Sequence, residues 1–375
     1  MTRARRGAFA APVAALLERL AACPGALMAT LLVAAGLAPP AGAAPVSDPY
    51  RLSPHVAPGE RHGGVRLLGT VSLRPERIDG LTLGGLSGLA WDADEALLYA
   101  LSDAGAVFHL RPRFADGRLA GVEALAAYRL RDARGRALAG ARGDAEALVV
   151  ERADNGRAGD SVLVASFERV PRIARFAPDG RALGEVPLPA RLRRVEAYAS
   201  PNQGLEALAL VPGRGLLTAP ERPLAGGEDG VVRIVSVATG DDWSYRLAAT
   251  PNASLVALEA LPDGALLALE RGHGLMFLPM IITLRRARID FDAPGSAAEV
   301  RTLATLDTSE GFSVDNFEGL TRYRGLEFFM VSDDNFNALQ KTLLTHFSLA
   351  EPGDGADERD ARNMNPVKKQ PIDMN

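Results

Sequence analysis

A short phrase built around an acidic residue recurs along the chain, and its side chains are the ones best suited to chemistry. Its second position falls at residues 87, 146, 206, 259 and 318, so successive copies stand 59, 60, 53 and 59 residues apart. The first copy carries Ser87, and the other four carry Glu146, Glu206, Glu259 and Glu318. Clustered carboxylates either bind a hard cation such as Ca²⁺ or pair with arginine.

A second set of acids follows the first at a similar interval. Its members are Asp103, Glu168, Glu221, Glu270 and Asp333. Arg169, Arg222 and Arg271 directly follow three of them, which favours arginine–carboxylate pairs or a clamp on an anionic substrate. The densest oxygen cluster is Asp333-Asp334-Asn335, which suggests a metal loop or, equally, a turn whose side chains cap backbone groups.

Regular repetition of this kind indicates one supersecondary unit copied around an axis. Turn signals divide the third unit into four short strands, expected at 205–211, 215–220, 231–237 and 243–247. The second unit divides in the same way, at 147–150, 161–166, 172–176 and 183–188. Four-stranded units at this spacing predict an all-β fold, a β-propeller with five visible blades, and six remain possible.

The two ends of the domain supply one blade between them. The segment 318–349 reads as three strands, and the strand expected at 65–73 would complete that blade and close the ring. The first strand of a blade starts, and the second ends, at the same mouth of the central channel. Up to nine carboxylates from the two sets are therefore expected to converge there. Like charges this close need compensation, and metal and arginine both remain open.

The remaining segments read as an export signal, a linker and a tail. Residues 1–43 combine a basic start, an apolar stretch and an Ala-Gly-Ala cleavage site, which predicts a Sec-type signal peptide in preference to a lipoprotein or twin-arginine signal. We expect a linker at 44–64, the propeller at 65–349 and a disordered tail at 350–375. The mature protein would be periplasmic or secreted, with no membrane anchor, no cysteine and, by default, a monomeric state.

Charge and motif patterns exclude several functions. The net charge is −4, and nothing in the chain indicates nucleic-acid binding. Gly85-Leu86-Ser87-Gly88-Leu89 lacks the second glycine of a nucleophile elbow, so Ser87 is interpreted as a neutral member of the glutamate ring. Among the histidines, only His273 follows a mouth acid in a loop and is a candidate for substrate binding. The apolar stretch 272–282 reads as a buried strand or a loop over the channel.

Several runs together carry a resemblance to a known family. They are Asp315-Asn316-Phe317-Glu318-Gly319-Leu320, Val331-Ser332-Asp333-Asp334-Asn335-Phe336-Asn337 and Asn202-Gln203-Gly204-Leu205-Glu206-Ala207-Leu208. Over roughly 65–349 the chain resembles the bacterial phytase-like family, also named for an esterase-like activity of phytase. The resemblance implies a propeller related to calcium-dependent phytases and a small-molecule phosphate or other ester as substrate.

The implied site would be metal-assisted. Ca²⁺ would lie among Asp103, Glu146, Glu206, Glu259, Glu318, Asp333 and Asp334, and substrate would contact Arg169, Arg222, Arg271, His273 and Asn335, with no catalytic residue assigned. Two alternatives stay open because a fold does not fix a chemistry. The chain could be a non-enzymatic ligand- or protein-binding propeller, or a lactonase-like hydrolase with a channel metal.

Overall fold

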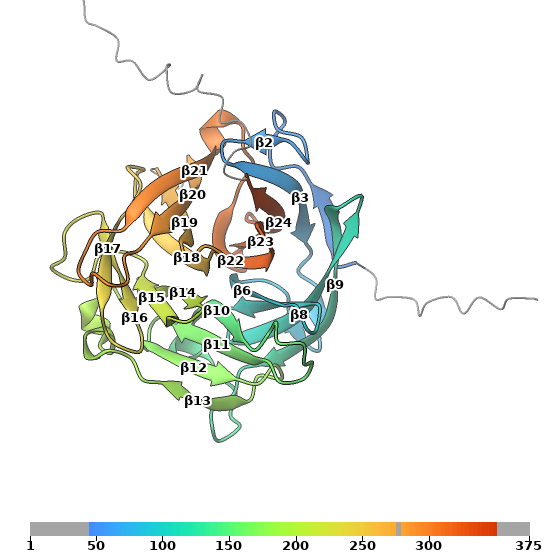
Figure 1. The fold of residues 1–375 in the computed structure, drawn as a ribbon. Coiled ribbons are helices and arrows are strands. Elements are labelled where there is room, and N and C mark those ends of the chain that lie inside the picture. Colours follow the sequence, from blue (N-terminus) through green and yellow to red (C-terminus); the bar gives the residue numbers. More distant parts are fainter. Residues whose placement is uncertain (1–44, 275–278, 351–375) are drawn as a thin grey trace, which may run out of the picture. The chain divides into compact units, whose positions relative to one another are not determined.

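In the computed structural model, residues 45–274 and 279–350 are described. The expected signal peptide, the middle of the apolar stretch 272–282 and the expected tail beyond residue 350 lie outside these residues. The described chain forms five antiparallel four-stranded blades arranged as a β-propeller, as predicted (Figure 1). The count is five, and the possibility of a sixth blade is not realised in the described residues.

Four of the blades are continuous in sequence. The first is β6 (Leu86–Asp92), β7 (Leu97–Ser102), β8 (Ala106–Ala115) and β9 (Arg118–Arg129). The second is β10 (Ala145–Glu151), β11 (Val162–Phe167), β12 (Arg172–Phe176) and β13 (Ala182–Val186). The third is β14 (Leu205–Val211), β15 (Gly215–Pro220), β16 (Val231–Ser236) and β17 (Asp242–Arg246). The fourth is β18 (Ser254–Ala260), β19 (Leu266–His273), β20 (Met280–Arg288) and β21 (Glu299–Asp307). All of the predicted strands of the second and third units agree with these bounds to within two residues.

The fifth blade closes the ring with both ends of the domain. It contains β22 (Asn316–Arg324), β23 (Glu327–Asp333), β24 (Thr342–Leu349) and, from the N-terminal side, β3 (Val65–Leu73). β24 and β3 pair antiparallel along their whole lengths, from Thr342 opposite Leu73 to Leu349 opposite Val65. The predicted closure by the N-terminal strand is confirmed.

The segment expected to be a linker differs from that expectation. It contains β1 (Ser47–Tyr50) and β2 (Arg61–His62), and both pair with β3. β1 lies on the outer edge of β3 and satisfies backbone groups that an edge strand would otherwise leave unpaired. A small hairpin, β4 (Arg77–Ile78) and β5 (Leu81–Thr82), then leads into the first blade.

The core lies between neighbouring blades. Each of five buried apolar clusters combines residues of two adjacent blades, such as Leu255 and Ala268 of the fourth with Ile234 and Tyr245 of the third. Alternating side chains of each twisted sheet therefore serve two interfaces, which fixes the radial order of the blades and the five inner strands β6, β10, β14, β18 and β22 around the axis (Figure 1).

Helical structure is limited to short 3₁₀ turns in the described residues: η1 (Gly140–Arg142), η2 (Ala190–Leu192), η3 (Val195–Ala197) and η5 (Thr308–Glu310). Within 45–274 and 279–350, no helix has the length and apolar character needed to span a bilayer.

Candidate active site and metal centre

A β-bulge near the start of every inner strand sets the position of the candidate site. In each blade the pairing with the second strand shifts by an extra residue close to this point. The residues at the bulge are Ser87, Glu146, Glu206, Val256 and Glu318. A bulge re-aims the side chain that it carries, and bulges are common next to active sites. The repeated phrase is therefore the sequence of this bulge.

The prediction that Glu259 lies at the channel mouth with the other glutamates is wrong. The phrase at 258–261 resembles the other copies, but the bulge of β18 lies three residues earlier and carries Val256. Glu259 instead lines a separate cavity with the ends of the inner strands, among them Val211 and Arg322. Its carboxylate accepts hydrogen bonds from the backbone N–H groups of Arg322 at 3.0 Å and Ala260 at 2.9 Å. Glu259 is a structural acceptor away from the predicted mouth.

The predicted site position of Glu270, in the second set of acids, is wrong by one residue in the same blade. At the end of the second strand, each blade places one residue opposite the position two residues before the bulge. In the first, second, third and fifth blades this residue is an acid, namely Asp103, Glu168, Glu221 and Asp333. In the fourth blade it is Arg271. Glu270 accepts a hydrogen bond from the Tyr245 hydroxyl of the third blade at 2.5 Å and another from Arg285 Nη1 of its own blade at 2.8 Å. The fourth blade thus places a cation where the others place an acid.

One cavity of about 690 Å³ collects the ends of these strands. Among the described residues that line it are nine acids: Asp103, Asp144, Glu146, Glu168, Glu206, Glu221, Asp315, Glu318 and Asp333. Arg169, Arg271, His273, Asn335 and Ser87 line the same cavity. The predicted convergence of carboxylates on one end of the channel is observed, with Asp144 and Asp315 in place of Glu259 and Glu270.

The tightest group of oxygens belongs to the second blade. One carboxylate oxygen from each of Asp144, Glu146 and Glu168 lies within 4.8 Å of the other two. Gly204 of the next blade leaves room for this group, because a Cβ atom there would lie 2.8 Å from Glu168 Cγ. Asp144 was not predicted as a site residue, and the signal that could have identified it is its position two residues before Glu146 in the run Gly143-Asp144-Ala145-Glu146.

Two buried polar side chains that line the cavity have neither a hydrogen-bond nor an ion-pair partner among the described residues. Glu146 is only 8% exposed, yet its carboxylate accepts no hydrogen bond and forms no ion pair there. The Ser87 hydroxyl oxygen is buried without a partner as well. Buried polar groups are normally satisfied, so the Glu146 carboxylate and the Ser87 hydroxyl are available to a ligand or a water molecule in the cavity.

Burial and crowding shift the acids of this cavity toward their protonated forms. Burial raises the pKa of Glu146 and of Glu206 well above the ordinary range, and neighbouring carboxylates add to both effects. Burial likewise raises the pKa of Asp103 to about 6, of Glu168 to about 7 and of Asp333 to about 8. The site therefore favours either bound protons or a bound cation.

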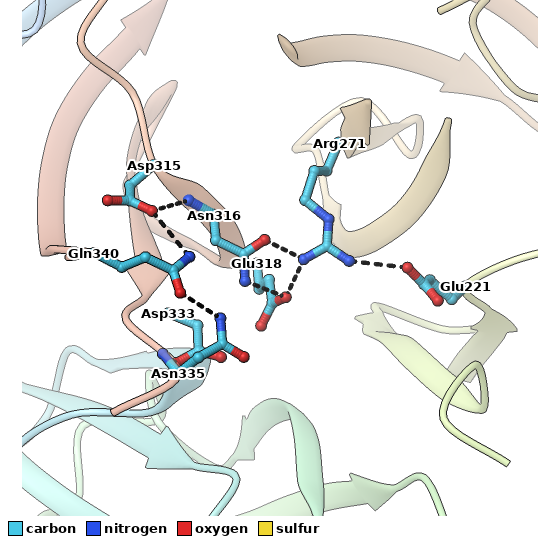
Figure 2. A network of polar contacts seen from close by, with 8 residues as sticks. All are labelled: Glu221, Arg271, Asp315, Asn316, Glu318, Asp333, Asn335 and Gln340. Atoms are coloured by element: carbon cyan, nitrogen blue, oxygen red, sulfur yellow. Dashed lines mark hydrogen bonds and ion pairs between the residues drawn. The ribbon is translucent and has the colours of Figure 1, made fainter. Parts of the chain in front are cut away.

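Arg271 joins three blades through its guanidinium group (Figure 2). Its Nη2 pairs with Glu221 Oε1 of the third blade at 2.9 Å, and its Nη1 contacts both Glu318 Oε1 and Asn316 Oδ1 of the fifth. Burial lowers the pKa of this guanidinium, but the charges of Glu318 and Glu221 outweigh it and raise the pKa overall. Arg271 is therefore a permanent cation in the cavity.

The other predicted contacts divide between the cavity and its supporting loops. Arg169 Nε pairs with Asp144 Oδ2 at 2.7 Å, and Asn335 donates to Gln340 Oε1 at 3.3 Å at the rim (Figure 2). Arg222 is absent from the described lining and donates to the backbone carbonyl of Asn252 at 2.9 Å. Asp334 is also absent from the described lining of the cavity.

The carboxylate of Asp334 has a structural role. Its Oδ1 accepts from Gly85 N at 2.8 Å and Phe336 N at 3.0 Å, which ties the loop after β23 to the first blade. Of the two interpretations of Asp333-Asp334-Asn335, the structure supports the turn, because Asn335 and Phe336 both have a positive φ. Asp333 still faces the cavity, while its Oδ1 accepts from Asn335 N at 2.7 Å.

The family of the chain follows from a match over most of its folded length. The model of the family described as "Phytase-like: Esterase-like activity of phytase" matches residues 81–336, which include all five bulge residues. The chain belongs to the phytase-like family. The resemblance inferred from the sequence is thereby confirmed. Among curated proteins, no match is found for this phytase-like chain.

Solved structures similar to this phytase-like protein share little sequence with it. A gluconolactonase, XC5397 from Xanthomonas campestris, is 14% identical with a TM-score of 0.39, over 80% of this chain and 100% of that one. The PQQ-bound aldose sugar dehydrogenase from Streptomyces coelicolor is 14% identical with a TM-score of 0.36, over 78% and 100%. The β-propeller domain of Myceliophthora thermophila Cps50 (Swd1) is 12% identical with a TM-score of 0.35, over 82% and 99%.

Proposed function

We propose that this phytase-like protein is an exported, Ca²⁺-assisted hydrolase of esters whose site is the acidic cavity. The observation that carries the proposal is Glu146, a buried carboxylate that has no partner among the described residues and lies beside Asp144 and Glu168. The signal peptide expected at 1–43 supports export to the periplasm or beyond, and a monomer with a small-molecule substrate is the corresponding form.

The donor set fits a calcium ion. Ca²⁺ takes ~6–8 oxygen ligands in flexible geometry and favours carboxylates, which Asp144, Glu146 and Glu168 supply from one small volume. The unpartnered Ser87 hydroxyl is a further oxygen in the same cavity. In contrast, no cysteine lies in 45–274 or 279–350, and the one histidine of the lining, His273, stands at the end of β19, so a site for a softer metal is disfavoured.

Such an ion, when bound, polarises a carbonyl or phosphoryl oxygen and makes a coordinated water more acidic. The chain's own residues supply the rest of the chemistry. Glu206 neighbours Glu168 and, with its raised pKa, can hold a proton and pass it to a leaving group. Elsewhere in the lining of the same cavity, Met280, Val314 and Leu339 offer apolar contact to the remainder of an ester.

A thermal melt of the chelator-stripped mature protein tests the metal part of the proposal. We expect Ca²⁺ to raise the melting temperature with saturation, because an ion that binds only the folded state stabilises it. Mg²⁺, which demands a stricter octahedral geometry, should give a smaller rise. A melting temperature that does not change when Ca²⁺ or another divalent ion is added would contradict the proposal and favour a binding module without a metal.

The charge of the cavity predicts a substrate preference. Nine acids and two arginines among the described lining residues leave a negative potential even with one divalent ion bound. Focused potentials change effective substrate concentrations by roughly 10–10³-fold. We therefore expect kcat/KM for neutral p-nitrophenyl acetate to exceed that for dianionic p-nitrophenyl phosphate by at least ~10-fold.

The leaving group is the same in both substrates, so the comparison isolates substrate charge. Raising the salt concentration should narrow the difference because mobile ions screen the cavity. Equal rates, or a preference for the phosphate, would contradict the charge argument while leaving the metal site intact. Absence of turnover with both substrates and with a lactone would contradict the hydrolase itself.

A further inference from the structure

The fourth blade breaks the pattern of the site at both of its positions. Where the other blades present an acid or serine at the bulge, β18 presents Val256. Where they present an acid at the end of the second strand, β19 presents Arg271 opposite Ser254. The blade thus removes two possible carboxylates from the cavity and adds one fixed positive charge.

Arg271 satisfies the acids on either side of it. Glu221 and Glu318 both bind its guanidinium, and Asn316 Nδ2 donates to Glu318 Oε1 at 2.8 Å (Figure 2). The side chain of Arg271 is largely covered and only 17% exposed. Glu221 of the third blade and Glu318 of the fifth therefore share a cation that the chain itself supplies.

The acids of the second blade have no such support. Among the described residues, Arg271 forms no hydrogen bond or ion pair with Asp144, Glu146 or Glu168. Within 45–274 and 279–350, the one cation that pairs with these acids is Arg169, which contacts Asp144 and has a side chain 47% exposed. Exposed ion pairs contribute little, so this half of the cavity keeps its need for a cation.

We propose that Arg271 takes the place of a second metal ion, an inference that rests on the proposed function. The guanidinium occupies the Glu221–Glu318 half of the cavity, and a divalent ion is confined to the Asp144–Glu146–Glu168 half. The protein accordingly binds one Ca²⁺ per chain. Glu318, predicted from the sequence as a metal ligand, is then a partner of arginine, and Arg271 limits the number of ions that the cavity accepts.

The test counts bound Ca²⁺ by calorimetry and elemental analysis, with Ca²⁺ present throughout purification so that each variant can be studied in its bound form. Wild type should bind one ion per chain, and Arg271→Gln should bind two, because Glu221 and Glu318 lose their cation. Arg271→Lys keeps the charge and should bind one. Arg222→Gln, an arginine at the corresponding sequence position outside the described cavity lining, should also bind one.

A second variant keeps the inference testable even if Arg271→Gln does not fold. Glu318→Gln in the wild-type background should leave one ion bound with a Kd changed by less than threefold, whereas a true ligand would lose far more affinity. Two ions on wild type, one ion on folded Arg271→Gln, or a large loss of affinity in Glu318→Gln would each overturn the role of Arg271. An absence of bound ion in every variant would overturn the proposed function as well.

Discussion

Replacing Glu146 by Gln is expected to shift stability in opposite directions with and without calcium. Without the ion, the variant should melt at a higher temperature than wild type, because glutamine cannot ionise at a buried position where the Glu146 carboxyl group has no hydrogen-bond partner among the described residues. Unsatisfied buried polar groups cost ~1–3 kcal/mol each, and more when charged. With saturating Ca²⁺, the order should reverse, because the variant lacks one of three clustered carboxylates.

The same substitution should weaken Ca²⁺ binding by ~100-fold or more. Changes to residues that merely orient a metal ligand typically cost ~10–100-fold in affinity, and Glu146 is proposed as a ligand itself. Ester hydrolysis should fall in parallel when it is measured at a fixed, subsaturating Ca²⁺ concentration. Calorimetric titration measures the Ca²⁺ affinity. Thermal melts with and without Ca²⁺ show whether the order of the melting temperatures of wild type and variant reverses.

Glu259→Gln is the matched control. Glu259 is also a glutamate on an inner strand, and it belongs to the same phrase in the sequence, but it lines the other cavity and accepts two backbone hydrogen bonds. Its replacement should lower stability in both conditions and leave the Ca²⁺ affinity within about threefold of wild type. If Glu146→Gln lowered the melting temperature without Ca²⁺ and bound Ca²⁺ normally, Glu146 would be a structural acid.

The architecture could be predicted because strands, turns and the repeat all point the same way. Strand 205–211 is bounded by glycine on one side and a Pro-Gly turn on the other, and β14 has the same bounds. The N-terminal strand could be assigned to the last blade because that blade is one strand short. β1 was not predicted, since its four residues Ser47–Tyr50 carry no alternation that distinguishes a strand from a loop.

The site residues could be predicted in the blades where the repeat has constant spacing. The prediction was wrong in the fourth blade, where the spacing changes. In the fourth blade, Leu258-Glu259-Ala260-Leu261 imitates the phrase, while the bulge carries Leu255-Val256-Ala257-Leu258. Sequence alone shows two overlapping matches, and only strand register selects between them. The same register moves Arg271 into line with the acids and turns Glu270 away. Register depends on how the blades pack, which a local pattern does not record.

The metal-free protein is expected to lose stability as the pH rises from about 4 to about 8. The folded chain holds the pKa of Asp103 at about 6, of Glu168 at about 7 and of Asp333 at about 8, with burial as the first cause of each shift. Unfolded, these groups titrate near 4. In this window the folded state therefore binds more protons than the unfolded state, and its stability falls with increasing pH.

Calcium should reverse that dependence, because the ion binds the deprotonated carboxylates and releases their protons. The rise in melting temperature caused by Ca²⁺ should accordingly be larger at pH 8 than at pH 5. Titrations near pH 6.5 in buffers of different ionisation enthalpy should reveal protons released on binding. A metal-free stability that increases between pH 4 and 8 would mean that the acids of the cavity are ionised and satisfied by the chain alone, and that the cavity has no need of a cation.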